Sequence, residues 1–472
     1  MSESTTIQEK MYLLAQQRDL FEQAKSYAYE YMDGVFDRNV FPTKAALVKL
    51  SSFDEPLPQK PGNPADMLRM LHEYGSPATV THTGGRYFGL VVGSVFPPVM
   101  AAKWLADVWD QISTLYVTSP VLSKLETICE KWLIELLGLP DECVAGFVSG
   151  TSMATLCGLA AGRYEILKRS DWDVNSRGLF GAPPLRVVIG AEAHGTVFKA
   201  LALLGLGKDR VEMVPVDNQG RMIAAKVPKL DRNTLVILQA GNVNSGSFDP
   251  LDEICDRANA AGAWVHVDGA FGLWAAASQN KQYLTHGVEK ADSWSVDGHK
   301  TLNTPYDSGI ILCRHHEALA SAMQATGSYI LYSENRDGML YTPEMSRRSR
   351  AIELWATIKI LGKSGVEELV DELCVRAQQF AKQLNAQGFH ILNDVVFNQV
   401  LVTCDSPEQT AATLKNLQQS GECWCGGAKW HDTPVIRVSV CSWATTEEDI
   451  TRTVSAFVQA REGTGLSSNS IQ

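Results

Sequence analysis

The sequence lacks the features of a membrane or secreted protein. No apolar run reaches the roughly 18 residues that a transmembrane helix needs, and residues 1–17 lack the basic start and apolar core of a secretory signal. An excess of positive charge is also absent, since the net charge is −11. This balance argues against binding to nucleic acid or to an anionic membrane surface. We therefore expect a cytoplasmic protein whose partners include neither nucleic acid nor a membrane.

The ten cysteines lack the dense, regular spacing of a disulfide-bonded scaffold, so we expect most of them to be buried free thiols. The only close pair is Cys423 and Cys425, with His431 nearby. A second pair of ligands at the spacing of a zinc site is missing. The sequence therefore predicts no metal site.

The composition is that of a folded protein with more than one structural unit. Apolar residues make up 45% of the 472-residue chain and charged residues 20%, values typical of globular proteins. Helix-forming residues fill the first 50 positions without a glycine before Gly34, and a proline-rich connector follows. We expect four regions: an N-terminal helical segment at 1–75, a large α/β domain at 76–345, a small C-terminal α+β domain at 346–462 and a tail at 463–472.

Short apolar runs alternate with longer amphipathic stretches in the central part of the chain. Four of these runs lie at 185–189, 234–238, 264–267 and 309–313. Such runs are typical of buried parallel strands joined by crossover helices. Polar loops follow them, and in an open α/β sheet these loops border the ligand crevice. We therefore expect the functional site in the loops.

The sequence after Pro343 predicts the elements of the smaller domain. Helical periodicity resumes at 346–361, and strands are expected near 399–403 and 435–440. A last helix begins after Thr446, whose side chain can cap it.

The strongest candidate site combines Lys300 with Asp268. Lys300 lies in a polar loop, residues 295–308, before the last apolar run. A lysine amine that loses its proton can form an imine with an aldehyde cofactor, although most lysines only solvate a surface. Asp268 ends an apolar run, where a carboxylate could hold a protonated pyridine nitrogen or only cap the next helix. The two residues are 32 positions apart, enough for one helix and a return strand, so their loops can meet.

Three further polar motifs accompany this pair. A Gly/Ser/Thr turn with Thr151 and Ser152 could cradle a phosphate at a helix start, or only cap the helix. His194 could lie over a flat cofactor, although a capping or core histidine is the commoner case. Asn242 and Asn244 could bond a ring hydroxyl, or only satisfy the backbone of their turn.

In this order and spacing, the motifs resemble those of the pyridoxal-phosphate-dependent group II amino-acid decarboxylases, the family that contains the aromatic-L-amino-acid and glutamate decarboxylases. The resemblance extends from Arg86 through 119–126 to 437–443. It implies an aspartate-aminotransferase-like fold of type I, with a large, mostly parallel sheet domain, an N-terminal helical segment and a small C-terminal α+β domain. It also implies a homodimer with active sites at the subunit interface, where residues 86–88 reach the neighbour's site.

The same resemblance implies roles for individual residues. The cofactor would be pyridoxal 5'-phosphate, held by Lys300 as a Schiff base and by Asp268 at the ring nitrogen. His194 would stack on one face of the ring, and Ala270 would lie under the other. The remaining predicted cofactor contacts, in the phosphate cup, beside the cofactor and at its ring hydroxyl, are Thr151, Ser152, His299, Asn242 and Asn244.

Tyr329 is the predicted proton donor. It lies in a polar stretch without clear periodicity, as a mobile lid does. In the decarboxylases that the sequence resembles, a tyrosine at this distance after the lysine protonates the carbanion left by CO2. Tyr332 is the alternative donor, and either residue could be a packed aromatic.

Several side chains could contact the substrate. Arg347, Arg348 or Arg437 could bind its carboxylate, and we take Arg348 and Arg437 as predicted substrate-binding residues. Tyr87 and Phe88 hint at an aromatic or apolar pocket, unless they are part of a dimer core.

The sequence departs from the family pattern near the lysine. Thr301 stands where a tryptophan is common in the relatives, and Asn242 and Asn244 stand where many members have threonines. Asp297 carries an unwelcome charge near the expected phosphate unless it faces away. These positions shape the pocket, so analogy does not identify the substrate.

The predicted activity is that of a carboxy-lyase, which converts an L-amino acid, an aromatic one among the candidates, to the amine and CO2. A lyase or aldolase that breaks another carbon–carbon bond, and an oxidative decarboxylase that yields an aldehyde, are alternatives with the same cofactor. An inactive binding protein of the same fold is the alternative from a different class.

Overall fold

The computed structural model describes residues 6–325 and 334–465. Its largest feature is a seven-stranded sheet in the order β2-β8-β7-β6-β5-β3-β4. The strands are β2 (Val144–Val148), β3 (Arg186–Gly190), β4 (Val211–Val214), β5 (Thr234–Gln239), β6 (Trp264–Asp268), β7 (Ser293–Asp297) and β8 (Gly309–Cys313). Strands β3 to β7 run parallel, whereas β8 is antiparallel to both β7 and β2. The mostly parallel sheet is confirmed, but the expectation that 309–313 is a parallel strand is wrong.

The segment before Lys300 also differs from the prediction. Residues 295–297 belong to strand β7 and not to a polar loop, because the serines of this strand are buried and bonded. The hydroxyls of Ser293 and Ser295 lie 2.9 and 3.3 Å from the ring nitrogens of His266 on β6. Three 3₁₀ turns, and not the expected α-helix, connect β6 to β7.

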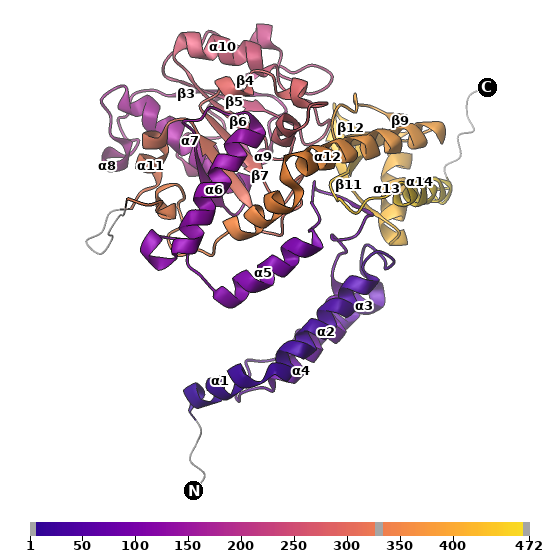
Figure 1. Cartoon of the computed structure of the whole chain (residues 1–472). Helices are drawn as coiled ribbons and strands as arrows, with labels where there is room; N and C mark the ends of the chain where they lie inside the picture. The colour runs from indigo at the N-terminus through magenta and orange to yellow at the C-terminus, as the bar shows by residue number, and fades with distance from the viewer. Residues whose placement is uncertain (1–5, 326–333, 466–472) are drawn as a thin grey trace, which may run out of the picture.

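Helices cover both faces of this sheet (Figure 1). On one face, Ile189 and Ile237 pack against α7 (Thr151–Lys168), α9 (Gly195–Leu203) and α11 (His316–Met323). On the other face, Val188 and Val236 pack with α6 (Pro120–Leu137), α10 (Leu251–Ala261) and the first half of α12 (Ala351–Ala386). Because successive strand side chains point to opposite faces, continuous apolar runs fill both cores. The short helix α8 (Val174–Arg177) follows α7.

A second sheet forms from the C-terminal part of the chain. Its order is β1-β11-β12-β10-β9. The strands are β1 (Tyr87–Phe88), β9 (His390–Ile391), β10 (Gln399–Thr403), β11 (Trp424–Trp430) and β12 (Thr433–Ser439). They pack against the second half of α12, α13 (Pro407–Ser420) and α14 (Glu447–Glu462). As predicted, Thr446 caps the last helix, because its side chain accepts a hydrogen bond from the Asp449 N–H.

The N-terminal part is helical, as predicted. It contains α1 (Ile7–Gln16), α2 (Arg18–Gly34), α3 (Lys44–Lys49) and α4 (Pro64–Met70), and α5 (Pro97–Trp109) follows β1. Figure 1 shows α1, α2 and α4 projecting away from both sheets. Neither α1 nor α2 buries a single residue. None of the described helices is both long and apolar enough to cross a membrane.

Candidate active site

A cavity of about 660 Å³ lies where strands β5, β6 and β7 end, beside the start of α7. This is the edge of an open α/β sheet at which ligands bind. Eight of the predicted site residues line the cavity: Lys300, Asp268, His194, Thr151, Ser152, Ala270, His299 and Arg437. Residues that are far apart in the sequence are therefore brought to one site.

Lys300 reaches the cavity from the loop after β7. The chain turns tightly at Gly298, where an added Cβ would lie 2.5 Å from the Ser308 hydroxyl. The Lys300 amine lies 3.1 Å from a carboxylate oxygen of Asp297. A second close approach comes from Gly93, where a Cβ would lie 2.2 Å from the Lys300 carbonyl oxygen. The lysine loop is thus held between two parts of the same chain.

Asp268 is the last residue of β6 and is 5% exposed. Burial raises the pKa of its carboxyl, and the charges of His194 and Lys300 oppose this shift. The Ala270 N–H donates to its Oδ1 at 3.3 Å. A carboxylate in this position is stabilised by a cationic partner, which the protonated nitrogen of a pyridine ring would provide.

The start of α7 fits a phosphate group. Thr151 is the first residue of this helix and is 6% exposed, and its hydroxyl has no hydrogen-bond partner among the described residues. Ser149 and Ser152 line the same part of the cavity. A buried hydroxyl without a partner is costly, and a helix N-terminus attracts anions. These residues therefore fit the phosphate of the cofactor that the resemblance implies.

Two histidines line the cavity from different loops. His194 caps α9, since its ring accepts from the Thr196 N–H at 3.4 Å. The capping interpretation thus holds, although the residue also lines the cavity. Burial lowers the pKa of His194, which favours the neutral ring. His299 stacks on Tyr306 with ring centroids 4.3 Å apart, and its Nδ1 accepts from the Ser308 N–H at 3.1 Å.

The two asparagines serve mainly their own turn. The Asn242 side chain accepts from the N–H groups of Asn244 and Ser245 at 2.9 and 3.2 Å. It is 1% exposed and does not line the cavity. The Asn244 oxygen accepts from Arg437 Nη1 at 3.4 Å, which places it behind a residue that does line the cavity. The geometry of Asn242 therefore fits stabilisation of its own turn rather than a contact with a cofactor hydroxyl.

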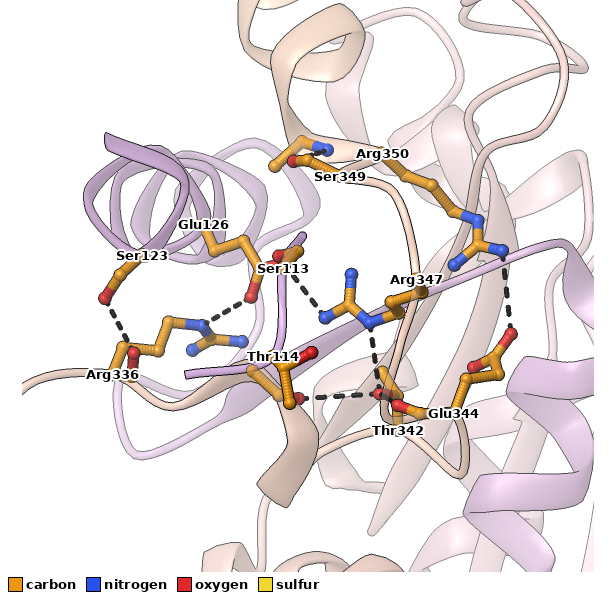
Figure 2. A network of polar contacts seen from close by, with 12 residues as sticks. Ser113, Thr114, Ser123, Glu126, Arg336, Thr342, Glu344, Arg347, Ser349 and Arg350 are labelled. Atoms are coloured by element: carbon orange, nitrogen blue, oxygen red, sulfur yellow. Dashed lines mark hydrogen bonds and ion pairs between the residues drawn. The ribbon is translucent and has the colours of Figure 1, made fainter. Parts of the chain in front are cut away.

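The three candidate arginines lie in different surroundings. Arg437 lines the cavity. Figure 2 shows that Arg347 belongs to a separate buried network, where its guanidinium lies 3.0 Å from Glu126. Arg348 pairs with Asp307 at 2.5 Å and with Glu353 at 2.7 Å, and it does not line the cavity. The prediction of Arg348 as a substrate-binding residue is therefore wrong for this conformation, because carboxylates of the chain already occupy its guanidinium.

The segment around β1 also departs from the prediction. Phe88 is fully buried in the C-terminal core, where it packs on Phe380, so it cannot contact a substrate. Arg86 is 3% exposed and donates to the Phe36 and Glu422 carbonyls of its own chain. Residues 86–88 are thus packed within their own chain in this structure.

Tyr87 itself is stacked on Trp424, with ring centroids 5.2 Å apart, and is not part of the cavity lining. The cavity receives instead Leu90 and Val91, from the residues that follow β1. An aromatic motif does not reveal from its sequence whether it is core or cavity wall.

Tyr329 and Tyr332 lie outside the described residues. The sequence interpretation missed Tyr306, a tyrosine that does line the cavity. Its position six residues after Lys300, in the same polar loop, was the available signal. Burial raises the pKa of Tyr306, so its phenol keeps its proton.

All ten cysteines are free and buried. Cys423 and Cys425 lie in the C-terminal core, whereas His431 is exposed. Among residues 6–325 and 334–465, no three His, Cys, Asp or Glu side chains are grouped so that they could hold a metal ion.

Comparison with known proteins agrees with this geometry. The model of the pyridoxal-dependent decarboxylase conserved domain matches residues 50–403. An aromatic-L-amino-acid decarboxylase of Bacillus atrophaeus is 27% identical over 376 residues, 77% of this chain and 76% of that protein. An acidic amino acid decarboxylase of Mus musculus is 27% identical over 354 residues, 72% of this chain and 62% of that protein. The structure of Oryza sativa TDC with PLP and tryptamine shares the fold, with a TM-score of 0.86, 19% identity and coverage of 98% and 100% of the two chains.

Proposed function

The chain belongs to the pyridoxal-dependent decarboxylase family, and from this premise we propose that it releases the carboxylate of an L-amino acid as CO2 and yields the amine. The family's cofactor is pyridoxal phosphate. One observation carries the proposal: Lys300 and Asp268 line the same cavity, next to the helix start at Thr151. An amine for covalent attachment, a carboxylate for the ring nitrogen and a cup for the phosphate are the groups that this cofactor requires.

Each of these residues would have one task at the bound cofactor. Pyridoxal phosphate supplies an electron sink for the pair of electrons that a departing carboxylate leaves behind. Lys300 would hold it through its amine, and Asp268 would keep a proton on its ring nitrogen by ion pairing. His194 and Ala270 would flank the faces of the ring, and Thr151 would bind the phosphate.

We propose Arg437 as the residue that binds a substrate carboxylate. It is 8% exposed, and burial lowers the pKa of its guanidinium. It forms no ion pair with another described residue, and its Nε has no hydrogen-bond partner among them. A buried cation without a counter-ion is costly, so an anionic ligand would complete the site. Phe271 and Tyr306 also line the cavity, which supports an aromatic or apolar substrate side chain.

The test is a panel of aromatic, apolar and acidic L-amino acids, with CO2, amine, aldehyde and peroxide measured together. We expect CO2 and amine in equal amounts from at least one aromatic amino acid. Aldehyde with peroxide would identify an oxidative decarboxylase, and cleavage products without CO2 would identify another lyase. The absence of CO2 with every amino acid would contradict the proposal, and the Lys300→Ala variant serves as the blank.

We also propose that the chain works as a homodimer. The N-terminal helices expose large apolar side chains, which in a lone chain would remain in water. They are Ile7, Met11, Tyr12, Leu13, Phe21 and Tyr29. A second copy that covers these helices would remove the exposed apolar surface from water.

We further propose a cytoplasmic location. The ten unpaired thiols support a reducing compartment such as the cytoplasm.

A further inference from the structure

Asp297 connects three functional groups of the cavity. It is the last residue of β7 and is 1% exposed. Its Oδ1 accepts from the Thr151 N–H at 2.6 Å, at the start of α7. Its Oδ2 lies 3.1 Å from the Lys300 amine and 3.5 Å from His299 Nε2. The charge that the sequence placed near the phosphate therefore faces the site.

The backbone around Asp297 fixes this carboxylate. Its N–H donates to the Ala270 carbonyl at 2.9 Å, and its carbonyl accepts from Trp274 Nε1 at 2.8 Å. On the side of α7, a Cβ at Gly150 would lie 3.6 Å from Asp297 Oδ1 and 3.2 Å from the ring of His299. The side chain cannot easily turn away, because the strand and the helix start enclose it.

The Asp297 carboxylate accepts a hydrogen bond from a backbone N–H that a phosphate at this helix start would also need. The first N–H groups of a helix have no partner within the helix and are the groups that bind anions. One of them, that of Thr151, already donates to Asp297. A phosphate bound at the unpartnered Thr151 hydroxyl would lie next to the Asp297 carboxylate. The two negative charges would repel each other strongly, because little water is present to screen them.

We propose that Asp297 is a positioning residue that limits how tightly the phosphate cup binds. In the cofactor-free protein its carboxylate is the counter-ion of Lys300 and competes with phosphate for the Thr151 N–H. This inference rests on the proposed function, since it takes the start of α7 as the phosphate cup. Its consequence is a weakened hold on the cofactor phosphate, so that occupancy of the enzyme follows the cofactor concentration around it.

The test uses inorganic phosphate as the probe and the full-length, cofactor-free protein, with dissociation constants from calorimetry at constant ionic strength. Asp297→Asn removes the charge but keeps an oxygen that can accept from the Thr151 N–H. We expect this variant to bind phosphate at least about tenfold more tightly than the wild type. Asp252→Asn is the control, because it changes the net charge equally at a half-exposed position where the carboxylate pairs with Lys290.

A gain in affinity separates this role from a merely structural one, because a damaged cup would bind phosphate more weakly. Equal or weaker binding by Asp297→Asn would overturn the inference. If that variant does not fold, Asp297→Ser gives the same test with a smaller polar side chain. Attachment of pyridoxal phosphate to Lys300 in the wild type is measured separately: its failure contradicts the proposed function, whereas attachment with unchanged phosphate affinity contradicts only the role of Asp297.

Discussion

Helices α2 and α7 have nearly the same length, 17 and 18 residues, but opposite surroundings. α7 buries eleven of its residues against the large sheet, and its first turn forms one wall of the cavity. α2 buries none of its residues and exposes Phe21 and Tyr29. α7 is enclosed by its own chain, whereas α2 packs on one side only, where Tyr27 stacks on His72 and Tyr29 on Trp104.

A single chain is enough to form the cavity next to α7, but it does not cover the apolar side chains of α2. The cavity is built on strands and on α7, whose partners are all in the same chain, so its charged groups are held at fixed positions. The N-terminal helices have fewer partners within the chain and leave large apolar side chains exposed, and we propose that a second copy covers them. Changes near α7 should therefore affect chemistry and stability, whereas changes on α2 should affect association.

The largest expected effect is a loss of activity from a change in the cavity next to α7. Asp268→Asn removes the charge that would keep the ring nitrogen protonated. Loss of one partner of a buried ion pair costs about 3 to 5 kcal/mol, which predicts a fall in kcat of about 10²- to 5 × 10³-fold. Steady-state kinetics would measure it, with circular dichroism as the check on folding. Full activity of this variant would mean that another group holds the ring.

The corresponding change in α2 is Phe21→Glu, which places a charge on the exposed apolar surface of this helix. Loss of one buried aromatic contact costs about 1.5 to 3 kcal/mol, and a twofold dimer loses it twice. We expect the dissociation constant of the dimer to rise by at least about 10²-fold, measured by sedimentation equilibrium. Phe180→Glu is the control, because Phe180 is 97% exposed in a different part of the chain. Equal dissociation of both variants would contradict the assignment of the interface to the N-terminal helices.

A change in the cavity can also separate binding from folding. Arg437→Met keeps an unbranched apolar stem but removes the guanidinium and its charge. Hydrogen bonds to charged groups contribute about 1.5 to 3 kcal/mol, so KM for the amino acid should rise by about 10- to 100-fold. Arg348→Met, outside the cavity, should leave KM unchanged. The opposite pattern would restore Arg348 as the substrate residue.

The smallest expected effect is on stability, and it is tested by replacing one glycine in each of the two helices. A Cβ at Gly158 of α7 would lie 2.6 Å from the His266 ring, whereas nothing lies within 4 Å of a Cβ at Gly34 of α2. Gly158→Ala should lower the free energy of unfolding by about 1 to 3 kcal/mol, because the site is already filled. Gly34→Ala should leave it unchanged or slightly higher. Thermal unfolding of both variants measures the difference, and equal melting temperatures would contradict the contrast in packing.

The sequence predicted best where local pattern and tertiary structure agree. The runs at 234–238 and 399–403 became β5 and β10 almost residue for residue, because continuous β-branched and apolar residues suit strands buried on both faces. Lys300 and Asp268 could be paired from sequence because Asp268 ends one apolar run and the 32 positions between them allow a return to the same edge of the sheet. The direction of β8 could not be predicted, since an apolar run is the same for either direction.

Other features depend on contacts that no local pattern contains. Ser295 suggested the start of a loop, but its hydrogen bond to His266, like that of Ser293, makes it suitable for a buried strand. The three arginines are alike in sequence, and only their carboxylate partners separate them. Asp297 was noticed as a charge near the phosphate, but its contacts with Thr151 and Lys300 required the fold.

The central claim is that Lys300 holds the cofactor, and one measurement tests it directly. The purified enzyme is incubated with pyridoxal phosphate, reduced with borohydride and digested, and the labelled peptide is identified by mass spectrometry. We predict one labelled peptide, which contains Lys300, and no stable label in the Lys300→Ala variant. A label on a different lysine, or one that persists in that variant, would contradict the account.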